Sequence, residues 1–268
     1  MKTKNKNLRL IAITRCKNEE ELLENWLQRT SEFADGIIVI DDGSTDNSFK
    51  MLQSHKKVIR IIKHEPGRPQ ENRKNRNKLF DAVREYDGEW AILLDIDEIM
   101  DVRLAGNLDD ILNRPTVGQI YFKEITLWRS NKEYRIDKPH MYNRQRTVCQ
   151  IVRMNNNLKW VPSWPYTFKH RIRMLLQKGI YLPIPPSGYE QLKGVSGETL
   201  DLPDLVKIHY HFADWDKVWW KHLRYAVRES IQLKKKLKDV PEIVDWATSR
   251  LNEDDLQLAP VKPEWGVL

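Results

Sequence analysis

Short apolar runs with strand character alternate with segments of helical periodicity along the first hundred residues. The expected strands are residues 8–14, 36–40, 58–63 and 90–94, and the expected helices are residues 19–30 and 72–86. Parallel strands that are joined through helices need right-handed crossovers, and the helices then cover the faces of the sheet. The pattern therefore predicts an α/β fold with a mostly parallel, Rossmann-like sheet flanked by helices.

Polar clusters follow three of these strands, at residues 14–19, 41–46 and 95–98. Open parallel sheets bind ligands beyond the carboxyl ends of their strands, so we expect the three clusters to meet in one crevice. Asp95 and Asp97 are two residues apart. On a strand such a pair projects from one face and can reach a hard cation and the oxyanions bound to it. A solvated turn is the alternative for an acidic group of this kind.

Four motifs in a fixed order connect the chain to a known family. They are residues 13–20 (ITRCKNEE), residues 40–46 (IDDGSTD), Arg76-Asn77 in the helix predicted over 72–86, and residues 95–97 (DID). In order and spacing the chain resembles family 2 glycosyltransferases of the GT-A fold, which use nucleotide-sugar donors and a DxD-type motif. The resemblance covers residues 1–100.

The resemblance implies a donor site at the strand ends. Thr14 and Asp42 would contact the base and ribose, Arg76 would lie near the nucleotide, and Asp95 near the ribose or metal. The expected donor-binding residues are Thr14, Arg15, Asn18, Asp41, Asp42, Arg76 and Asp95. Asp97 would hold Mn²⁺ or Mg²⁺, which neutralises charge on a diphosphate leaving group, and Asp95 and Asp97 are the expected catalytic residues. The alternatives are a turn-forming Asp42 and a helix-surface Arg76.

Two histidines stand close together in Ile208-His209-Tyr210-His211-Phe212. In an extended segment His209 and His211 fall on one face, and apolar or aromatic residues fall on the other. GT-A enzymes often add a histidine from the C-terminal region as a metal ligand, and this pair resembles that element. Both are therefore candidate ligands beside Asp97, and the pattern does not decide between them. A purely structural role is the alternative.

The formal charge of +7 is unevenly distributed. Residues 1–100 carry 18 basic and 18 acidic side chains, so the excess lies in residues 101–268. No Asp or Glu occurs from Lys138 to Tyr189, where nine cations interleave with Trp160, Trp164, Tyr166 and Phe168. Cations attract phosphates and aromatic faces stack on sugars or bases, which suits a glycan, lipid-linked, protein or nucleic-acid acceptor. A solvated basic face with core aromatics is the alternative.

The general base that deprotonates the acceptor stays open among His170, Glu190, Glu198, Asp201 and Glu124. Many family 2 enzymes place a carboxylate after the metal motif, and the acid-free stretch occupies much of that interval. Inversion and retention of anomeric configuration are both compatible with the fold.

Trp215, Trp219, Leu223, Val227 and Ile231 recur about every fourth residue and predict an amphipathic helix over residues 214–238, with this stripe in the core. A short helix over residues 241–251 and a surface tail would follow. We divide the chain into a nucleotide-sugar-binding half (1–100), an acceptor-binding half of the same domain (101–213) and a C-terminal helical extension (214–268). No apolar run reaches the ~20 residues of a membrane span, which predicts a cytoplasmic protein.

The sequence thus predicts a metal-dependent glycosyltransferase that moves a sugar from a nucleotide diphosphate to an acceptor hydroxyl. A sugar-1-phosphate nucleotidyltransferase is the first alternative, but it is expected to carry a glycine-rich loop after the first strand, where residues 14–18 contain no glycine. A non-catalytic basic module for nucleic acid is the second. It has no need for carboxylates collected at several strand ends.

Overall fold

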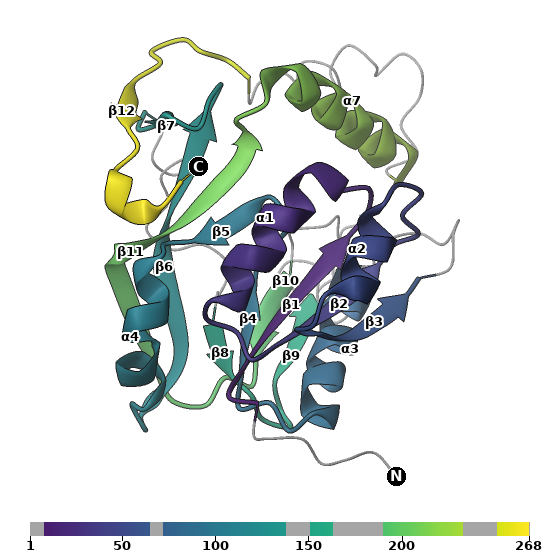
Figure 1. Ribbon diagram of the computed structural model, residues 1–268, viewed down its shortest axis with the longest axis vertical. Helices are drawn as coiled ribbons and strands as arrows, with labels where there is room; N and C mark the ends of the chain where they lie inside the picture. The colour runs from purple at the N-terminus through teal and green to yellow at the C-terminus, as the bar shows by residue number, and fades with distance from the viewer. Residues whose placement is uncertain (1–7, 65–71, 138–150, 163–189, 233–250, 268) are drawn as a thin grey trace, which may run out of the picture.

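The computed structural model describes residues 8–64, 72–137, 151–162, 190–232 and 251–267 (Figure 1). The strands are β1 (Leu10–Cys16), β2 (Gly36–Asp41), β3 (Val58–Lys63), β4 (Trp90–Leu93), β5 (Glu98–Met100), β6 (Val117–Trp128), β7 (Glu133–Arg135), β8 (Ile151–Arg153), β9 (Lys159–Pro162), β10 (Glu190–Lys193), β11 (Glu198–Phe212) and β12 (Leu258–Pro260). The helices are α1 (Glu20–Ser31), α2 (Ser48–Ser54), α3 (Asn72–Glu85), α4 (Arg103–Leu112), α7 (Trp215–Gln232) and the 3-10 turn η2 (Pro263–Trp265).

The central sheet has ten strands, and its main path runs β12-β7-β6-β8-β4-β1-β2-β3. Strands β3, β2, β1 and β4 are parallel, whereas β8 is antiparallel to β4 and β6. Strands β2 and β3 lie on one side of β1, and β4 lies on its other side. The strand order therefore reverses between β1 and β4. The predicted α/β class and mostly parallel first half are confirmed, with element boundaries shifted by one or two residues.

Alternate residues of the parallel strands face opposite layers. Leu10 and Ala12 of β1 belong to a core that includes the apolar faces of α1, α2 and α4. Ile11 and Ile13 belong to a second core with α3 and β9. Figure 1 shows α1 and α2 on the near face of the sheet. Because both faces are covered, β1, β2 and β4 are buried almost throughout, as their continuous apolar runs predicted, whereas the edge strand β3 is only partly buried.

Strand β11 connects the second half of the chain to the first. It runs parallel to β6 from the pair Glu198 and Val117 to the pair Phe212 and Trp128. Near its end it also pairs with β5, where His209 lies opposite Glu98. This pairing brings the two histidines of β11 to the turn that precedes β5.

The C-terminal part differs from the prediction. Trp219 and Leu223 of the expected core stripe are 46% and 40% exposed, while Val218 and His222 are buried. Trp215, at the start of the stripe, is half-buried against an apolar cluster, as expected. The side chains of Val227 and Ile231 lie outside the described residues, as do residues 233–250. The end of the chain is not a loose surface tail either, because β12 pairs with β7 and Trp265 is buried. Among the residues that the structure describes, no helix is both long and apolar enough to cross a membrane.

Candidate active site

The acidic motif lies in a turn rather than on a strand. Strand β4 ends at Leu93 and β5 begins at Glu98, so Asp95 and Asp97 lie in the connection. The Glu98 N–H donates to the Asp95 carbonyl oxygen at 3.0 Å, and the Asp95 N–H donates to the Glu98 carboxylate at 3.1 Å. The predicted strand face shared by both aspartates is therefore wrong. Asp95 is exposed, whereas the Asp97 side chain is only 14% exposed and faces β11.

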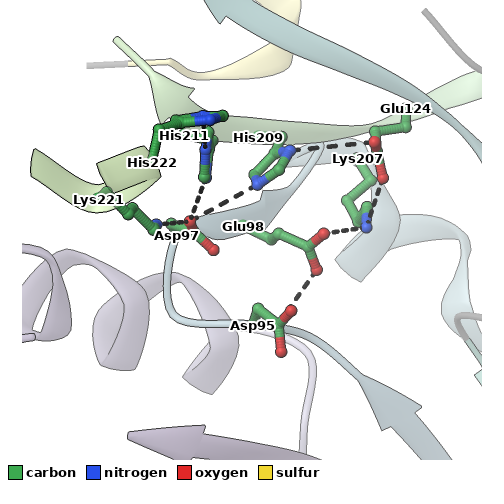
Figure 2. Close-up of polar contacts among 9 residues, drawn as sticks. All are labelled: Asp95, Asp97, Glu98, Glu124, Lys207, His209, His211, Lys221 and His222. Atoms are coloured by element: carbon green, nitrogen blue, oxygen red, sulfur yellow. Dashed lines mark hydrogen bonds and ion pairs between the residues drawn. The ribbon is translucent and has the colours of Figure 1, made fainter. Parts of the chain in front are cut away.

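Asp97, His209 and His211 converge, as Figure 2 shows. Asp97 Oδ2 lies 3.6 Å from His209 Nε2 and 3.5 Å from His211 Nδ1. Two ligands that are each about 2.1 Å from one cation lie about 3.0–3.5 Å apart at octahedral or tetrahedral angles. The separations from the carboxylate oxygen lie at or just beyond the upper end of this range, which is close to what a divalent cation requires. The sequence had placed both histidines on one face, and both reach the same oxygen.

The other ring nitrogen of each histidine also has a partner. Glu124 Oε1 lies 4.0 Å from His209 Nδ1, and His222 Nε2 lies 3.0 Å from His211 Nε2. Glu124 and His222 are both buried. Histidines that bind metals usually have such an outer partner, which fixes the ring and its tautomer. This second set of contacts is a further feature that fits a metal site.

A buried ion network lies behind His209. Lys207 Nζ is 2.7 Å from Glu124 Oε2 and forms a second ion pair with Glu98. Glu98 in turn accepts the Asp95 N–H, so the network links the acidic turn to β6 and β11 (Figure 2). Sequence reasoning missed Lys207 and the structural role of Glu98. The period of two along β11 was an available signal, because Lys207, His209 and His211 share one face.

Lys221 of α7 also reaches Asp97, with Nζ 2.6 Å from Oδ2. Burial alone would raise the pKa of the Asp97 carboxyl, but His209 and Lys221 outweigh it and hold that pKa well below its usual value. Burial works against a charged His209, yet Asp97, Glu98 and Glu124 raise its pKa overall. Burial lowers the pKa of His211 to about 3. Asp97 is therefore a carboxylate, and His211 is a neutral imidazole, at neutral pH.

Glu19 adds a titratable group at the start of α1. Burial raises the pKa of Glu19 to about 7, with Lys221 lowering it and Asp97 and Asp95 raising it further. Glu19 belongs to the cluster 14–19, so that cluster and the acidic turn share one electrostatic environment. The sequence had predicted this convergence, although Glu19 was not among the expected site residues.

The cluster at residues 14–19 is also joined directly to the cluster at residues 41–46. Arg15 Nε donates to Asp42 Oδ2 at 3.0 Å, and the Thr45 N–H donates to Asn18 Oδ1 at 2.8 Å. His64, at the end of β3, places Nδ1 3.7 Å from the other Asp42 oxygen. The turn needs the left-handed φ of 80° at Gly43, which favours glycine. Asp42 thus lies buried between two cationic or polar partners.

The remaining expected donor residues are placed as follows. Thr14 is buried in β1, and the Asp41 carboxylate accepts the Ser44 N–H at 3.2 Å. The Arg76 guanidinium lies 4.4 Å from the centre of the Trp160 ring, where it stacks between α3 and β9. Asn77, beside it, exchanges two hydrogen bonds with the Trp160 backbone. Arg76 is therefore not a freely solvated helix-surface cation.

Two candidates for the general base, Glu198 and Asp201, lie on β11 far from the histidines. Glu198 pairs with Val117 and Asp201 with Tyr121, whereas His209 pairs with Thr126. At about 3.3 Å per residue along β6, these positions are about 30 and 16 Å from the level of His209. Glu124 lies close, but it is buried and paired with Lys207. His170 and the Glu190 side chain lie outside the described residues.

Most of the acid-free segment also lies outside the described residues, namely 138–150 and 163–189. Three of its cations and aromatics lie in the described residues, namely Arg153, Lys159 and Trp160, and Lys159 is exposed. Arg153 donates to the backbone oxygens of Val117 and Arg114, and Trp160 is buried in the second core. These two side chains support the fold and do not form a solvated binding face.

The fold and the site define an α/β protein in which acidic residues and histidines meet near the point where the strand order reverses, the edge at which open parallel sheets bind ligands. Residues 11–172, more than half of the chain, match the family model described as glycosyl transferase family 2. The chain belongs to this family.

Two curated relatives are uncharacterized proteins of Mycobacterium bovis and Mycobacterium tuberculosis. Each is 30% identical over 118 residues, which cover 39% of this chain and 28% of the relative. The match thus spans less than a third of their length.

Among solved structures, S. aureus TarS 1–349 is 16% identical with a TM-score of 0.46, over 96% of this chain and 78% of that one. The mannosyltransferase PcManGT of Pyrobaculum calidifontis, solved with GDP-Man and Mn²⁺, is 14% identical with a TM-score of 0.44, over 92% and 71%. Similarities this low do not carry a ligand from one protein to the other.

Proposed function

We propose that this protein transfers a sugar from a nucleoside diphosphate donor to an acceptor hydroxyl, with a divalent cation held by Asp97, His209 and His211. One observation carries the proposal: in a family 2 chain, the Asp97 carboxylate of the acidic motif and two histidines of β11 bring their ligand atoms within 4.8 Å of one another. Mn²⁺ and Mg²⁺ both suit the proposal. When bound, the cation would neutralise the charge that builds up on the diphosphate as the glycosidic bond breaks.

The protein side chains have separate tasks in this proposal. Asp42 binds the base or ribose of the donor, and Arg15 holds the Asp42 carboxylate in place from one side. Lys221 adds a positive charge beside Asp97, which favours an anionic donor. Asp95, exposed at the same turn, is assigned to the ribose or the metal.

The proposal includes several classes of acceptor and assigns no single residue as the general base. Glycan, lipid-linked, protein and nucleic-acid acceptors all suit the proposal. Glu198 and Asp201 are disfavoured as the base by their distance along β11, and Glu124 by its burial against Lys207. Glu19 is a new candidate for proton transfer, because its raised pKa keeps part of its population protonated near neutral pH.

The nucleotidyltransferase and the nucleic-acid module are both weaker explanations. Neither accounts for a family 2 match together with two histidines that approach one oxygen of the Asp97 carboxylate. They also predict different chemistry, since the former releases pyrophosphate and the latter binds without a metal ion.

Donor hydrolysis and transfer test the proposal. Wild-type protein is incubated with a panel of nucleotide sugars, with Mn²⁺, Mg²⁺ or excess chelator, and released nucleoside diphosphate is measured. We expect release with one donor and a divalent ion, and its loss in Asp97→Asn. Asp109→Asn, an exposed carboxylate on α4, is the matched control and should keep full activity. Unchanged activity in chelator, or in Asp97→Asn, contradicts the metal assignment.

A further inference from the structure

His222 is a buried histidine outside the expected site residues. It lies on α7, is 3% exposed, and directs its Nε2 to the Nε2 of His211 at 3.0 Å (Figure 2). The His222 ring also packs against Phe212, with a centroid distance of 5.5 Å. Two imidazole nitrogens at this distance share one proton, so one ring donates and the other accepts.

The direction of this hydrogen bond follows from the opposite side of His211. Its Nδ1 faces Asp97 Oδ2 at 3.5 Å, the position from which it would bind a cation. A nitrogen that binds a cation must present a lone pair, so the single proton of a neutral ring is then on Nε2. His211 therefore donates, and His222 Nε2 accepts.

We propose that His222 is a positioning residue that fixes His211 in the orientation and tautomer that present Nδ1 to the cation. This inference rests on the metal site of the proposed function. His209 has a different support, because its Nδ1 faces the Glu124 carboxylate at 4.0 Å. Of these two partners, His222 of α7 lies at hydrogen-bond distance from His211, whereas the Glu124 carboxylate of β6 lies beside His209 beyond that distance, so loss of His222 weakens one ligand.

A packing role alone is the competing explanation, since His222 contacts Phe212 in a buried layer that includes Val218. Four variants separate the two. His222→Leu keeps bulk but accepts no hydrogen bond. In His222→Gln the amide oxygen reaches the place of Nε2, whereas in His222→Asn it is too short. Val218→Ala removes packing from the same helix and leaves His222 in place.

The experiment measures Mn²⁺ binding to metal-depleted protein without donor, by the loss of the free Mn²⁺ EPR signal and by calorimetry. Thermal unfolding in chelator reports the stability of each variant. We expect about tenfold to a hundredfold weaker binding in His222→Leu and His222→Asn, as is typical when an outer partner of a ligand is removed. His222→Gln should recover most of the affinity, and Val218→Ala should bind as wild type despite lower stability.

Wild-type affinity in both the Leu and Asn variants overturns the inference and leaves the metal site intact. Equal losses in Asn and Gln also overturn it, because the accepting group would then be irrelevant. If His222→Leu does not fold, the Asn and Gln pair still decides. A wild-type protein that binds no Mn²⁺ overturns the metal part of the proposed function, and this inference with it.

Discussion

Replacing Lys207 by methionine removes the shared cation of two buried carboxylates. The Lys207 side chain is 7% exposed, and those of Glu98 and Glu124 are 10% and 1% exposed. Breaking a buried ion pair typically costs about 3–5 kcal/mol because the remaining charge is left uncompensated. Here two carboxylates lose their partner at once, so we expect Lys207→Met to lower the free energy of unfolding by about 3–5 kcal/mol.

The loss should depend on pH with a definite sign. Burial raises the pKa of Glu98 even with Lys207 present, and removal of the lysine raises that pKa further. A raised pKa in the folded state means that stability is retained at low pH and lost as pH rises through that pKa. Lys207→Met should therefore be closer to wild type at pH 5 than at pH 8.

Urea unfolding in chelator, followed by tryptophan fluorescence, measures both effects. Lys193→Met, which changes an exposed strand lysine, is the matched control and should stay within about 0.5 kcal/mol of wild type. Changing Lys207 to Met together with Glu98→Gln and Glu124→Gln should recover most of the loss, because the network is then neutral. A single Lys207→Met variant within about 1 kcal/mol of wild type at pH 8 would refute this reasoning.

Four further substitutions test other parts of the site. Asp42→Ala should weaken nucleoside diphosphate binding about tenfold to over a hundredfold in calorimetry, since a charged hydrogen bond contributes about 1.5–3 kcal/mol. Unchanged affinity would remove Asp42 from the donor site. His209→Ala and His211→Ala should each raise the metal concentration for half-maximal activity, and identical titrations to wild type would return the pair to a structural role. In chelator, Glu19→Gln should become more stable than the wild type by about 1–3 kcal/mol as pH rises from about 4.5 to about 7, because burial penalises the charged wild-type carboxyl. Parallel curves of unfolding free energy against pH would exclude the raised pKa of Glu19.

The sheet and its ligand edge were predictable because local and global signals agree there. Continuous apolar runs at β1, β2 and β4 need burial on both faces, and only helices between them provide it. The polar ends of these strands then meet at the strand-order reversal. The pairing of His209 and His211 was predictable for a similar reason, since a period of two fixes their common face.

The C-terminal helix is present as α7, but its inward face was misassigned at Trp219 and Leu223 for a physical reason. Apolar periodicity assumes that the inner face of a helix packs on an apolar core. The first turn of α7 packs on an apolar cluster through Trp215 and Val218, but the next turn faces a charged site, so Lys221 and His222 point inward while Trp219 and Trp220 are 46% and 69% exposed. The prediction that Asp95 and Asp97 lie on a strand was wrong for a different reason, because a four-residue turn and a strand end look alike in sequence. Only the pairing of β5 with β11 decides where Asp97 points.

The most direct test of the central claim is a calorimetric titration of Mn²⁺ into metal-depleted wild-type protein and the variants Asp97→Asn, His209→Ala and His211→Ala. Three ligands for one cation predict a single site in the wild type and a loss of affinity in every variant, while folding is preserved. A wild-type protein without a Mn²⁺ site, or three variants that bind Mn²⁺ as the wild type does, would contradict the account.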